Sequence, residues 1–436
     1  MPSASKRKRK KKPVTALVAD HHGEIFELEG YAAVGMAGES LVPLTIANTI
    51  KMPFGGELMF LPDRLPILYN LHDNCFETPH ENPFAPGKPL FPVAAFNSPG
   101  YVASYISAYR EKQNAGYLPL FSYGAVGWSG GQFRTAATLI DSEKRQDLRQ
   151  MRKPDVIKGI RRMRTRLPSN HLRIHLETCA LEYGCPAAKN FFLSRYEAPL
   201  PTSGKCNAKC RGCLSRQDND AIPISQRRID FTPAADEIAA VALEHISNVS
   251  ASVVSFGQGC EGDPLFAAEV IEPALHLIRN KTTQGTVNMN TNGSRPDILG
   301  KLLEAGLDSI RISLNSVRET YYHRYFRPAD YKFSDVCRSI ATALEKDKFV
   351  SLNYLNMPGF TDTPQEMEAL IAFIEKYPIN MIQWRNLNFD PIRYWRIMNV
   401  SESHGMPIGM PKVLKTVRRA CPHLKFGYFN PPKERF

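Results

Sequence analysis

The sequence feature that most constrains this chain is a group of three cysteines within eight residues, Cys206, Cys210 and Cys213. The spacing CxxxCxxC supplies three thiolates, one fewer than a closed tetrahedral set requires. Structural metal sites usually fill all four positions, whereas a site that does chemistry keeps one open. The chain has nine cysteines in 436 residues, and this spacing would arise by chance about 0.004 times in such a chain. We therefore interpret residues 206–213 as a metal-binding loop.

The overall composition is typical of proteins with large buried cores. Hydrophobic residues make up 43% of the chain, and the length predicts two or three domains. No apolar run is long enough to cross a membrane, and Val14–Ala19 is too short for the core of a signal peptide. The cysteine content does not indicate a disulfide scaffold. We therefore expect a soluble, cytoplasmic protein whose clustered thiols bind metal.

The net charge of +12 is concentrated at the N-terminus, where Lys6–Lys12 (KRKRKKK) contributes seven positive charges. We expect residues 1–13 to form a disordered basic tail. Such a tail can bind nucleic acid or an acidic membrane surface, and it can equally serve only to keep a protein in solution. The sequence leaves both interpretations open.

Two segments precede the cysteine loop. Residues 14–134 are predicted to form a β-rich or mixed domain, because short apolar runs are separated by Gly, Pro, Asp and Asn. Residues 135–195 are predicted to form a helical connector. Eleven Lys or Arg and two acidic residues lie between Lys144 and Arg173. A basic face of this kind can follow a phosphate backbone, but the segment lacks aromatic residues for base stacking, which favours packing against acidic residues of the same chain.

From residue 196 onward, strand-like and helix-like segments alternate. The predicted strands are 197–203, 252–256, 286–290, 309–314, 349–355 and 379–387, and predicted helices begin near residues 232, 265, 296, 334 and 363. Repeated strand–helix units of this length indicate an α/β fold with a parallel sheet, here a partial (β/α)6 TIM-like barrel over residues 196–395. Residues 396–436 then form a C-terminal extension.

Polar, glycine-rich or thiol-bearing segments follow five successive predicted strands. The segments are the cysteine loop, 257–264, 290–293, 315–316 with Ser313 on the strand itself, and 357–359. In barrels of parallel strands the active site lies at the carboxyl ends of the strands. The pattern therefore predicts one shared site at that edge of the sheet.

With these motifs, residues 196–395 resemble the radical S-adenosylmethionine (radical SAM) superfamily. Cys206, Cys210 and Cys213 match its cluster motif. Gly262-Asp263-Pro264 is similar to the Gly-Glu-Pro element of the family, which binds the amino group of the cofactor. Asp263 replaces the usual Glu, and Glu261 stands two residues earlier. A carboxylate or a backbone carbonyl of this element therefore serves the cofactor.

The resemblance extends to the next two strand ends. Asn292 lies in a segment similar to the family element after the third strand, and Ser313 and Asn315 lie in one similar to the element after the fourth. In the family, polar side chains here reach the ribose or the carboxylate of the cofactor. Gly212 stands where an aromatic residue usually lies near the adenine. We therefore expect the adenine contact elsewhere, with the predicted sixth strand at Gln383–Asn386 as a candidate.

The resemblance implies a [4Fe–4S] cluster bound through three cysteines, with the fourth iron chelating S-adenosylmethionine. A flavodoxin- or ferredoxin-like reductant would supply one electron, and the 5′-deoxyadenosyl radical would abstract hydrogen from a substrate. The sequence identifies neither the substrate nor a catalytic side chain. Nucleic acid and peptide are both candidate substrates.

Other cysteines suggest a second centre. Cys179 and Cys185 lie close together, and with Cys75 or Cys421 they would bind a second cluster or zinc. Buried, inert thiols are the more common outcome for such residues. Cys260 and Cys337 are predicted core residues, and we expect His175 and Glu177 to share a strand face with Cys179.

A different class of function uses the same cysteine loop. A zinc-stabilised nucleic-acid-binding protein would bind the metal through the three cysteines of the loop and a fourth ligand such as Cys179 or Cys185. This alternative leaves the series of polar strand ends unexplained.

Overall fold

The computed structural model describes residues 12–145, 147–400 and 405–436, which divide into two compact units. Unit 1 contains the residues up to 140 together with 355–371 and 385–420, and unit 2 contains 141–354, 372–384 and 421–436. The expected basic tail lies almost wholly outside the described residues. None of the described helices combines the length and the apolar character that spanning a membrane requires.

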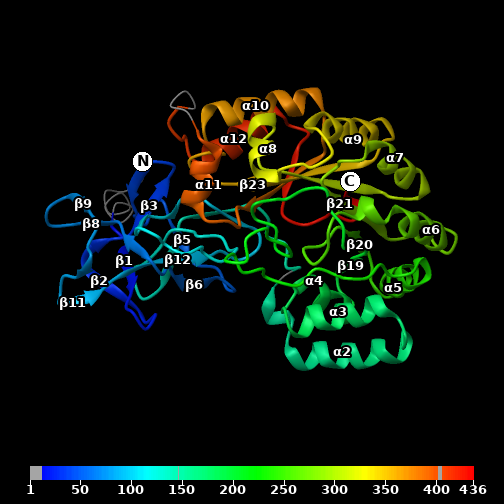
Figure 1. Cartoon of the computed structure of the whole chain (residues 1–436), viewed down its shortest axis with the longest axis horizontal. Coiled ribbons are helices and arrows are strands. Elements are labelled where there is room, and N and C mark those ends of the chain that lie inside the picture. The colour runs from blue at the N-terminus through cyan, green and yellow to red at the C-terminus, as the bar shows by residue number, and fades with distance from the viewer. Residues whose placement is uncertain (1–11, 146, 401–404) are drawn as a thin grey trace, which may run out of the picture. The chain divides into compact units, whose positions relative to one another are not determined.

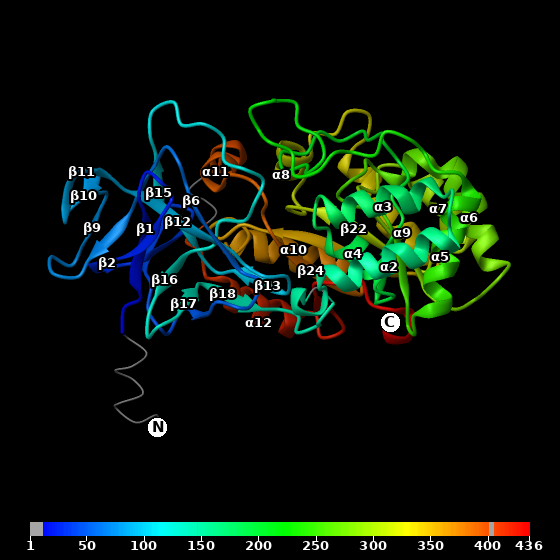
Figure 2. The same cartoon turned by 90° about the horizontal axis from the view of Figure 1, so that it is seen from below.

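Unit 1 is built from short, mostly antiparallel strands (Figure 2). Its largest sheet has the order β5-β17-β16-β1-β2-β8-β9, and β12 joins it by pairing with both β1 and β6. The apolar run TALVA becomes the central strand β1, four of whose five residues are buried. The strands of this sheet are β1 (Thr15–Ala19), β2 (Ile25–Ala32), β5 (Ile50–Lys51), β6 (Glu57–Phe60), β8 (Leu68–Asn70), β9 (Cys75–Glu77), β12 (Phe91–Phe96), β16 (Val126–Trp128) and β17 (Phe133–Thr135).

Unit 1 also contains smaller sheets, two helices and the first part of a third helix. The strands pair as β10-β11, β13-β18, β14-β3-β4 and β15-β7. Their bounds are β3 (Val34–Ala37), β4 (Ser40–Pro43), β7 (Arg64–Pro66), β10 (Glu81–Asn82), β11 (Ala85–Pro89), β13 (Tyr101–Ala103), β14 (Ile106–Ser107), β15 (Tyr109–Glu111) and β18 (Ala137–Leu139). The helices are α11 (Pro391–Met398), α12 (Met410–Ala420) and the first part of α10 (Pro364–Lys376).

A buried ion cluster connects the early strands of unit 1 to α11. Arg64, with a side chain only 1% exposed, donates to Asp390 at 3.0 Å and to Glu111 at 3.3 Å. The hydroxyl of Tyr109 donates to the other oxygen of Asp390 at 3.0 Å. Burial and the adjacent Asp390 raise the pKa of Tyr109 well above its usual value. Because the charges are paired and hydrogen-bonded, the cluster holds residues more than 300 positions apart in one unit.

Unit 2 contains a seven-stranded sheet in the chain order β19-β20-β21-β22-β23-β24-β25. The recorded pairings between β19 and β23, and between β24 and β25, are all parallel. The α/β partial-barrel fold predicted from the sequence is therefore confirmed, with β25 as a seventh strand that the periodicity did not reveal. The strands are β19 (Glu197–Pro199), β20 (Val253–Phe256), β21 (Thr286–Thr291), β22 (Ser309–Leu314), β23 (Phe349–Asn356), β24 (Met381–Asn386) and β25 (Lys425–Gly427).

Helices cover the outer face of this sheet (Figure 1). α5 packs beside α6, α6 beside α7 and α7 beside α9, while α2, α3 and α4 pack together next to α5 and β19. Their bounds are α2 (Lys153–Arg166), α3 (His171–Leu181), α4 (Pro186–Phe192), α5 (Ala235–Asn248), α6 (Ala268–Arg279), α7 (Pro296–Ala305), α8 (Glu319–Phe326) and α9 (Phe333–Glu345), with short 3-10 helices at Leu148–Gln150, Pro264–Ala267 and Lys433–Arg435.

Two helices show how individual residues determine where a helix begins or ends. α7 begins at Pro296 as predicted, because Pro suits the first helical turn, and it ends before Gly306, which adopts φ +131°. By contrast, the predicted start of α5 near residue 232 is wrong. The Glu237 carboxylate accepts the backbone N–H of Ala234 at 3.0 Å, so the helix begins at Ala235 instead.

Polar side chains line the inner face of the partial barrel. By strand register and hydrogen bonding, this face carries Ser255, Asn288, Asn290, Ser309, Arg311, Ser313, Asn353 and Gln383. Residues on the opposite face are apolar and buried against the helices, as Val254, Met289 and Ile310 show. The interior of this barrel therefore has the polarity of a binding site rather than of a packed core.

The residues after β25 close part of this interior. Asn430 donates to Glu197 at 2.7 Å and accepts from Gln383 at 2.9 Å, and its carbonyl oxygen accepts from Arg145. Because Glu197 is the first residue of β19, this contact lies toward the amino ends of the strands. This contact therefore does not cover the carboxyl ends of the strands, where the site is predicted.

The buried ion cluster gives a test of unit 1. Asp390→Asn leaves Arg64 without one of its two buried carboxylate partners, and we expect unit 1 to lose about 3–5 kcal/mol of unfolding free energy. Hydrogen exchange of β15 and α11 peptides along a denaturant series would measure the loss. Glu29→Gln, at an exposed position of β2, is the matched control. Equal effects of the two substitutions would contradict a stabilising role for the cluster.

Candidate functional site

The cysteine loop lies along the C-terminal end of α8. The backbone N–H of Lys209 donates to the carbonyl oxygen of Phe326 at 3.0 Å, and the N–H of Arg211 donates to that of Tyr325 at 3.1 Å. These bonds give a loop without regular structure a defined path. A rigid support of this kind allows several ligands from one short segment to reach the same metal.

The three thiols lie in partly buried surroundings. Burial, followed by the charge of Asp263, raises the pKa of Cys206 to about 12. Burial and the other two sulfurs raise the pKa of Cys210 well above its usual value. Negative charge on the other two sulfurs thus repels a thiolate at Cys210. A positively charged metal centre would relieve this repulsion and displace the protons.

Arg228 donates to a cysteine sulfur and was not identified from the sequence. Its guanidinium donates to Sγ of Cys213 at 3.3 Å, to Ser215 at 3.2 Å and to the carbonyl oxygen of Gly204 at 3.4 Å. Arg228 lies fifteen residues beyond Cys213, in a segment without a motif, so no sequence pattern points to it. A cation that donates to sulfur stabilises the thiolate form.

The turn after β20 lies directly against the cysteine loop. The N–H of Gly262 donates to the carbonyl oxygen of Ser203 at 2.5 Å, and the N–H of Asp263 donates to that of Lys205 at 2.8 Å. A Cβ atom at Gly262 would overlap the carbonyl oxygen of Lys205. Glycine is therefore required here by the close approach of two backbones.

Glu261 connects the ends of β19 and β20. Its buried carboxylate accepts the backbone N–H groups of Thr202 at 2.8 Å, Ser203 at 3.1 Å, Gly257 at 2.7 Å and Gln258 at 2.6 Å. Burial raises its pKa to about 7, although these four donors oppose the shift. Both oxygens are engaged by the protein itself, so the carboxylate acts first as a positioning group for the two strand ends.

Asp263 connects β20 to the end of β21. Its buried carboxylate accepts from the hydroxyl of Thr291 at 2.8 Å, from the N–H of Asn292 at 2.7 Å and from the N–H of Leu265 at 3.1 Å. Burial raises its pKa. The side chain of Asn292 in turn donates to Asn207 of the cysteine loop at 2.9 Å. One hydrogen-bonded network therefore joins Asp263, Asn292 and the loop.

The residues predicted at the end of β22 lie in the adjoining part of the sheet. Ser313 is half-buried and accepts from the Asn353 side chain of β23 at 3.2 Å. Asn315 is fully buried and donates to the carbonyl oxygen of Tyr321 in α8 at 3.1 Å. Their positions follow from the strand register, which places successive strand ends along one edge.

Only some residues of the sixth strand, which we suggest for the adenine contact, face the inside of the barrel. Trp384 is fully buried, with edge-to-face contacts to Tyr354 at 5.5 Å and to Phe426 at 5.8 Å between ring centroids. Its neighbour Gln383 points to the inner face and bonds Arg311. Trp384 is therefore part of the layer between sheet and helices.

The structure corrects the expected strand around Cys179. His175, Glu177 and Cys179 lie in the helix α3, where residues four apart share a face. His175 thus lies beside Cys179, with 3.5 Å between Nε2 and Sγ. Glu177 points elsewhere and pairs with Arg164 and Arg173.

The remaining cysteines differ in exposure. Cys260 is buried, as predicted, but Cys337 is only half-buried. Cys75 is exposed in unit 1, and Cys421 is buried in unit 2. Within the described residues, the group of potential metal ligands that contains Cys179 is completed by His175 and Cys260.

The radical SAM superfamily model matches residues 200–374. No curated protein matches the sequence.

Several solved structures align with parts of the chain at low identity. HydG, a maturase of the [FeFe]-hydrogenase, aligns at 18% identity and TM-score 0.38 over 66% of each chain. SuiB of Streptococcus suis bound to S-adenosylmethionine aligns at 16% identity and TM-score 0.36 over 53% of this chain and 49% of SuiB. Methylornithine synthase aligns at 12% identity and TM-score 0.35 over 65% of this chain and 77% of that one. The chain thus spans about two thirds of HydG and about half of SuiB.

The close backbone contact at Gly262 gives a direct test of this site. We expect Gly262→Ala to push the turn away from Lys205 and to prevent the cysteine loop from retaining iron. Iron and sulfide per chain after anaerobic reconstitution would measure the effect. The control is Gly300→Ala in α7, where an added Cβ meets its nearest neighbour at an ordinary 3.5 Å. Full iron content in Gly262→Ala would contradict this account of the turn.

Proposed function

We propose that this chain, in which residues 200–374 match the radical SAM superfamily model, is an enzyme that binds a [4Fe–4S] cluster and S-adenosylmethionine. Cys206, Cys210 and Cys213 would hold three irons of the cluster. When bound, the cluster supplies one electron that cleaves S-adenosylmethionine, and the resulting 5′-deoxyadenosyl radical removes hydrogen from a substrate. The observation that carries this proposal is the three-thiol loop held against the ends of β20 and β21.

The donor set suits such a cluster. Three cysteine sulfurs bind three of the four irons of such a cluster, which leaves one iron open for a small molecule. The backbone N–H of Ala208 points at Sγ of Cys206 at 3.4 Å, and Arg228 donates to Cys213. Hydrogen bonds to the sulfurs stabilise negative charge on an iron–sulfur cluster.

The cofactor contacts are proposed at the neighbouring strand ends. Because Asp263 and Glu261 are already occupied by backbone donors, we assign them the role of shaping the turn, whose carbonyl groups then face the amino group of the cofactor. Asn292, Ser313 and Asn315 are proposed for the ribose and carboxylate ends. Their side chains lie at the edge where the strand ends meet.

The substrate is proposed to be polar. The inner face of the barrel carries Arg311, Asn353 and several Ser and Asn side chains. Such groups bind a substrate through hydrogen bonds and charge rather than through apolar contact. Nucleic acid and peptide both meet this description, and a screen for molecules that stimulate cofactor cleavage would distinguish them.

The partner that delivers the electron is proposed to be a flavodoxin- or ferredoxin-like protein. All nine cysteines are free thiols in the structure. This state fits a reducing compartment such as the cytoplasm, where such electron carriers operate.

Substitution of the cluster ligands tests the proposal. We expect Cys206→Ala, Cys210→Ala and Cys213→Ala each to abolish iron retention and 5′-deoxyadenosine formation, because two thiolates do not hold the cluster. Iron analysis and chromatography of the reaction products would show this. Cys337→Ala, at a half-buried cysteine of α9, is the control. A colourless parent protein after anaerobic reconstitution would instead support the zinc-stabilised nucleic-acid-binding alternative.

Arg228 offers a second test, through the reduction potential of the cluster. We expect Arg228→Met to lower the potential, because it removes a positive charge and an N–H···S bond that stabilise the reduced cluster. The potential of Arg228→Lys should lie between those of the parent protein and Arg228→Met, since lysine keeps the charge but lacks the planar fork. A redox titration followed by electron paramagnetic resonance would give the order. Arg216→Met changes an exposed arginine of the same loop and serves as control. An unchanged potential in Arg228→Met would contradict the assignment.

A further inference from the structure

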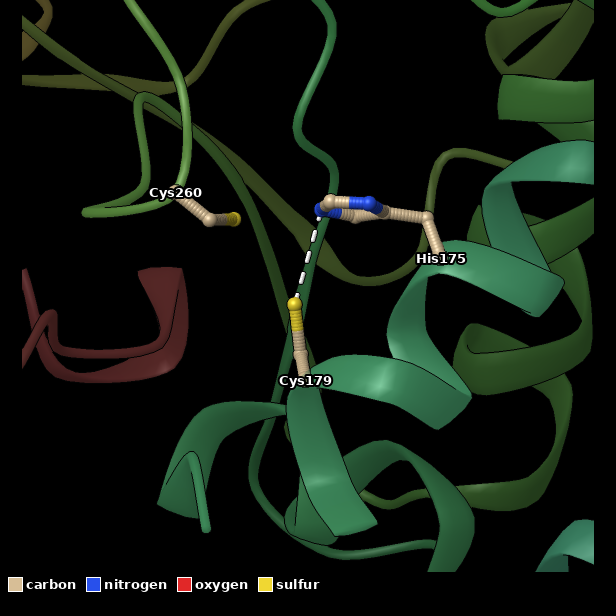
Figure 3. A group of neighbouring side chains, drawn as sticks. All are labelled: His175, Cys179 and Cys260. Atoms are coloured by element: carbon tan, nitrogen blue, oxygen red, sulfur yellow. Dashed lines mark hydrogen bonds between the residues drawn. The ribbon is translucent and has the colours of Figure 1, made fainter. Parts of the chain in front are cut away.

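A second group of metal-binding side chains lies in unit 2, formed by His175, Cys179 and Cys260. One ligand atom from each residue lies within 4.8 Å of the others. Figure 3 shows His175 and Cys179 on successive turns of α3, with Cys260 pointing toward them from the loop after β20. The sequence places Cys260 more than 80 residues beyond Cys179, so the fold alone brings the three together.

The distances suit a single ion. Zinc binds sulfur at about 2.3 Å and imidazole nitrogen at about 2.0–2.1 Å, so tetrahedral donor atoms lie about 3.5–3.8 Å apart. The observed separation of 3.5 Å between Nε2 of His175 and Sγ of Cys179 falls in this range. Two thiolates and an imidazole are the ligand types that zinc prefers.

Neighbouring contacts hold the donors in place. The N–H of Ile229 donates to the carbonyl oxygen of Cys260 at 2.8 Å, which fixes the loop that carries this cysteine. The ring of Phe231 packs edge-to-face against His175, with 6.1 Å between ring centroids. These contacts fix the positions of the donors, so binding of an ion costs little conformational entropy.

The three side chains differ in their exposure to solvent. Cys179 is 1% and Cys260 is 5% exposed, whereas His175 is half-buried and gives an ion access from solvent. The fourth position of a tetrahedral ion is left to water or to Cys185. The N–H of Cys185 donates to the carbonyl oxygen of Cys179 at 2.9 Å, which keeps Cys185 in the same neighbourhood.

We propose that His175, Cys179 and Cys260 bind one zinc ion. The ion joins helix α3 to the loop that carries Glu261 and Gly262, and so positions the turn that supports the cysteine loop. The site needs only its own three donors, and it stands whether or not the chain has the function proposed above.

The test separates this site from the cluster loop. A background variant with Cys206→Ser, Cys210→Ser and Cys213→Ser removes the cluster thiols. We expect it, purified from zinc-supplemented medium, to retain on the order of one zinc ion per chain. Replacement by cobalt(II) alone should produce the charge-transfer absorption of thiolate-bound, tetrahedral cobalt.

Adding Cys179→Ser or Cys260→Ser to this background should remove the zinc and the cobalt absorption. Cys337→Ser in the same background should leave both unchanged. His175→Asn gives a second route if a buried substitution prevents folding, as judged by circular dichroism, because His175 is half-buried. It should weaken cobalt binding and shift the cobalt spectrum.

Two results would overturn the proposal: a background variant that binds neither zinc nor cobalt, or zinc retained after both Cys179→Ser and Cys260→Ser. These results are measured as zinc and cobalt content in variants that lack the cluster thiols. A failure here is therefore distinct from a failure of cofactor cleavage.

Discussion

The candidate site depends on a close contact between two stretches of backbone. Gly262 and Asp263 donate their N–H groups to Ser203 and Lys205, at a separation that leaves no room for a Cβ atom on Gly262. This contact joins the turn after β20 to the segment that leads into the cysteine loop. Together with the bonds from Lys209 and Arg211 to the end of α8, this contact fixes the path of a loop that has no regular structure.

Buried carboxylates extend this contact to the neighbouring strands. Glu261 binds four backbone N–H groups, and Asp263 binds Thr291 and Asn292. Both carboxylates compensate their burial with hydrogen bonds, which is the condition under which a protein tolerates such groups. The acidic residues that the sequence suggested as cofactor ligands thus form the frame that holds three strand ends and the loop together.

Much of this arrangement could be predicted from local patterns. The start of α7 and the bounds of β22 agree with their predictions, because proline and apolar runs act locally. The start of α5 was missed because the Glu237 side chain caps the chain two residues after Thr232. β25 is three residues long, which is too short to show a period. Arg228 carries no motif, and its role depends on a contact with Cys213 across the loop.

The sequence by itself determined the three-thiol loop, the alternation of strands and helices, and the polar strand ends, because each is a short-range pattern of residue types. Only the tertiary structure decided what lies beside these segments. It joined residues 385–420 to the N-terminal strands through the buried pair of Arg64 and Asp390. It also placed Cys260 beside His175 and Cys179. The physical reason is that such contacts arise from packing between distant segments, which no local periodicity encodes.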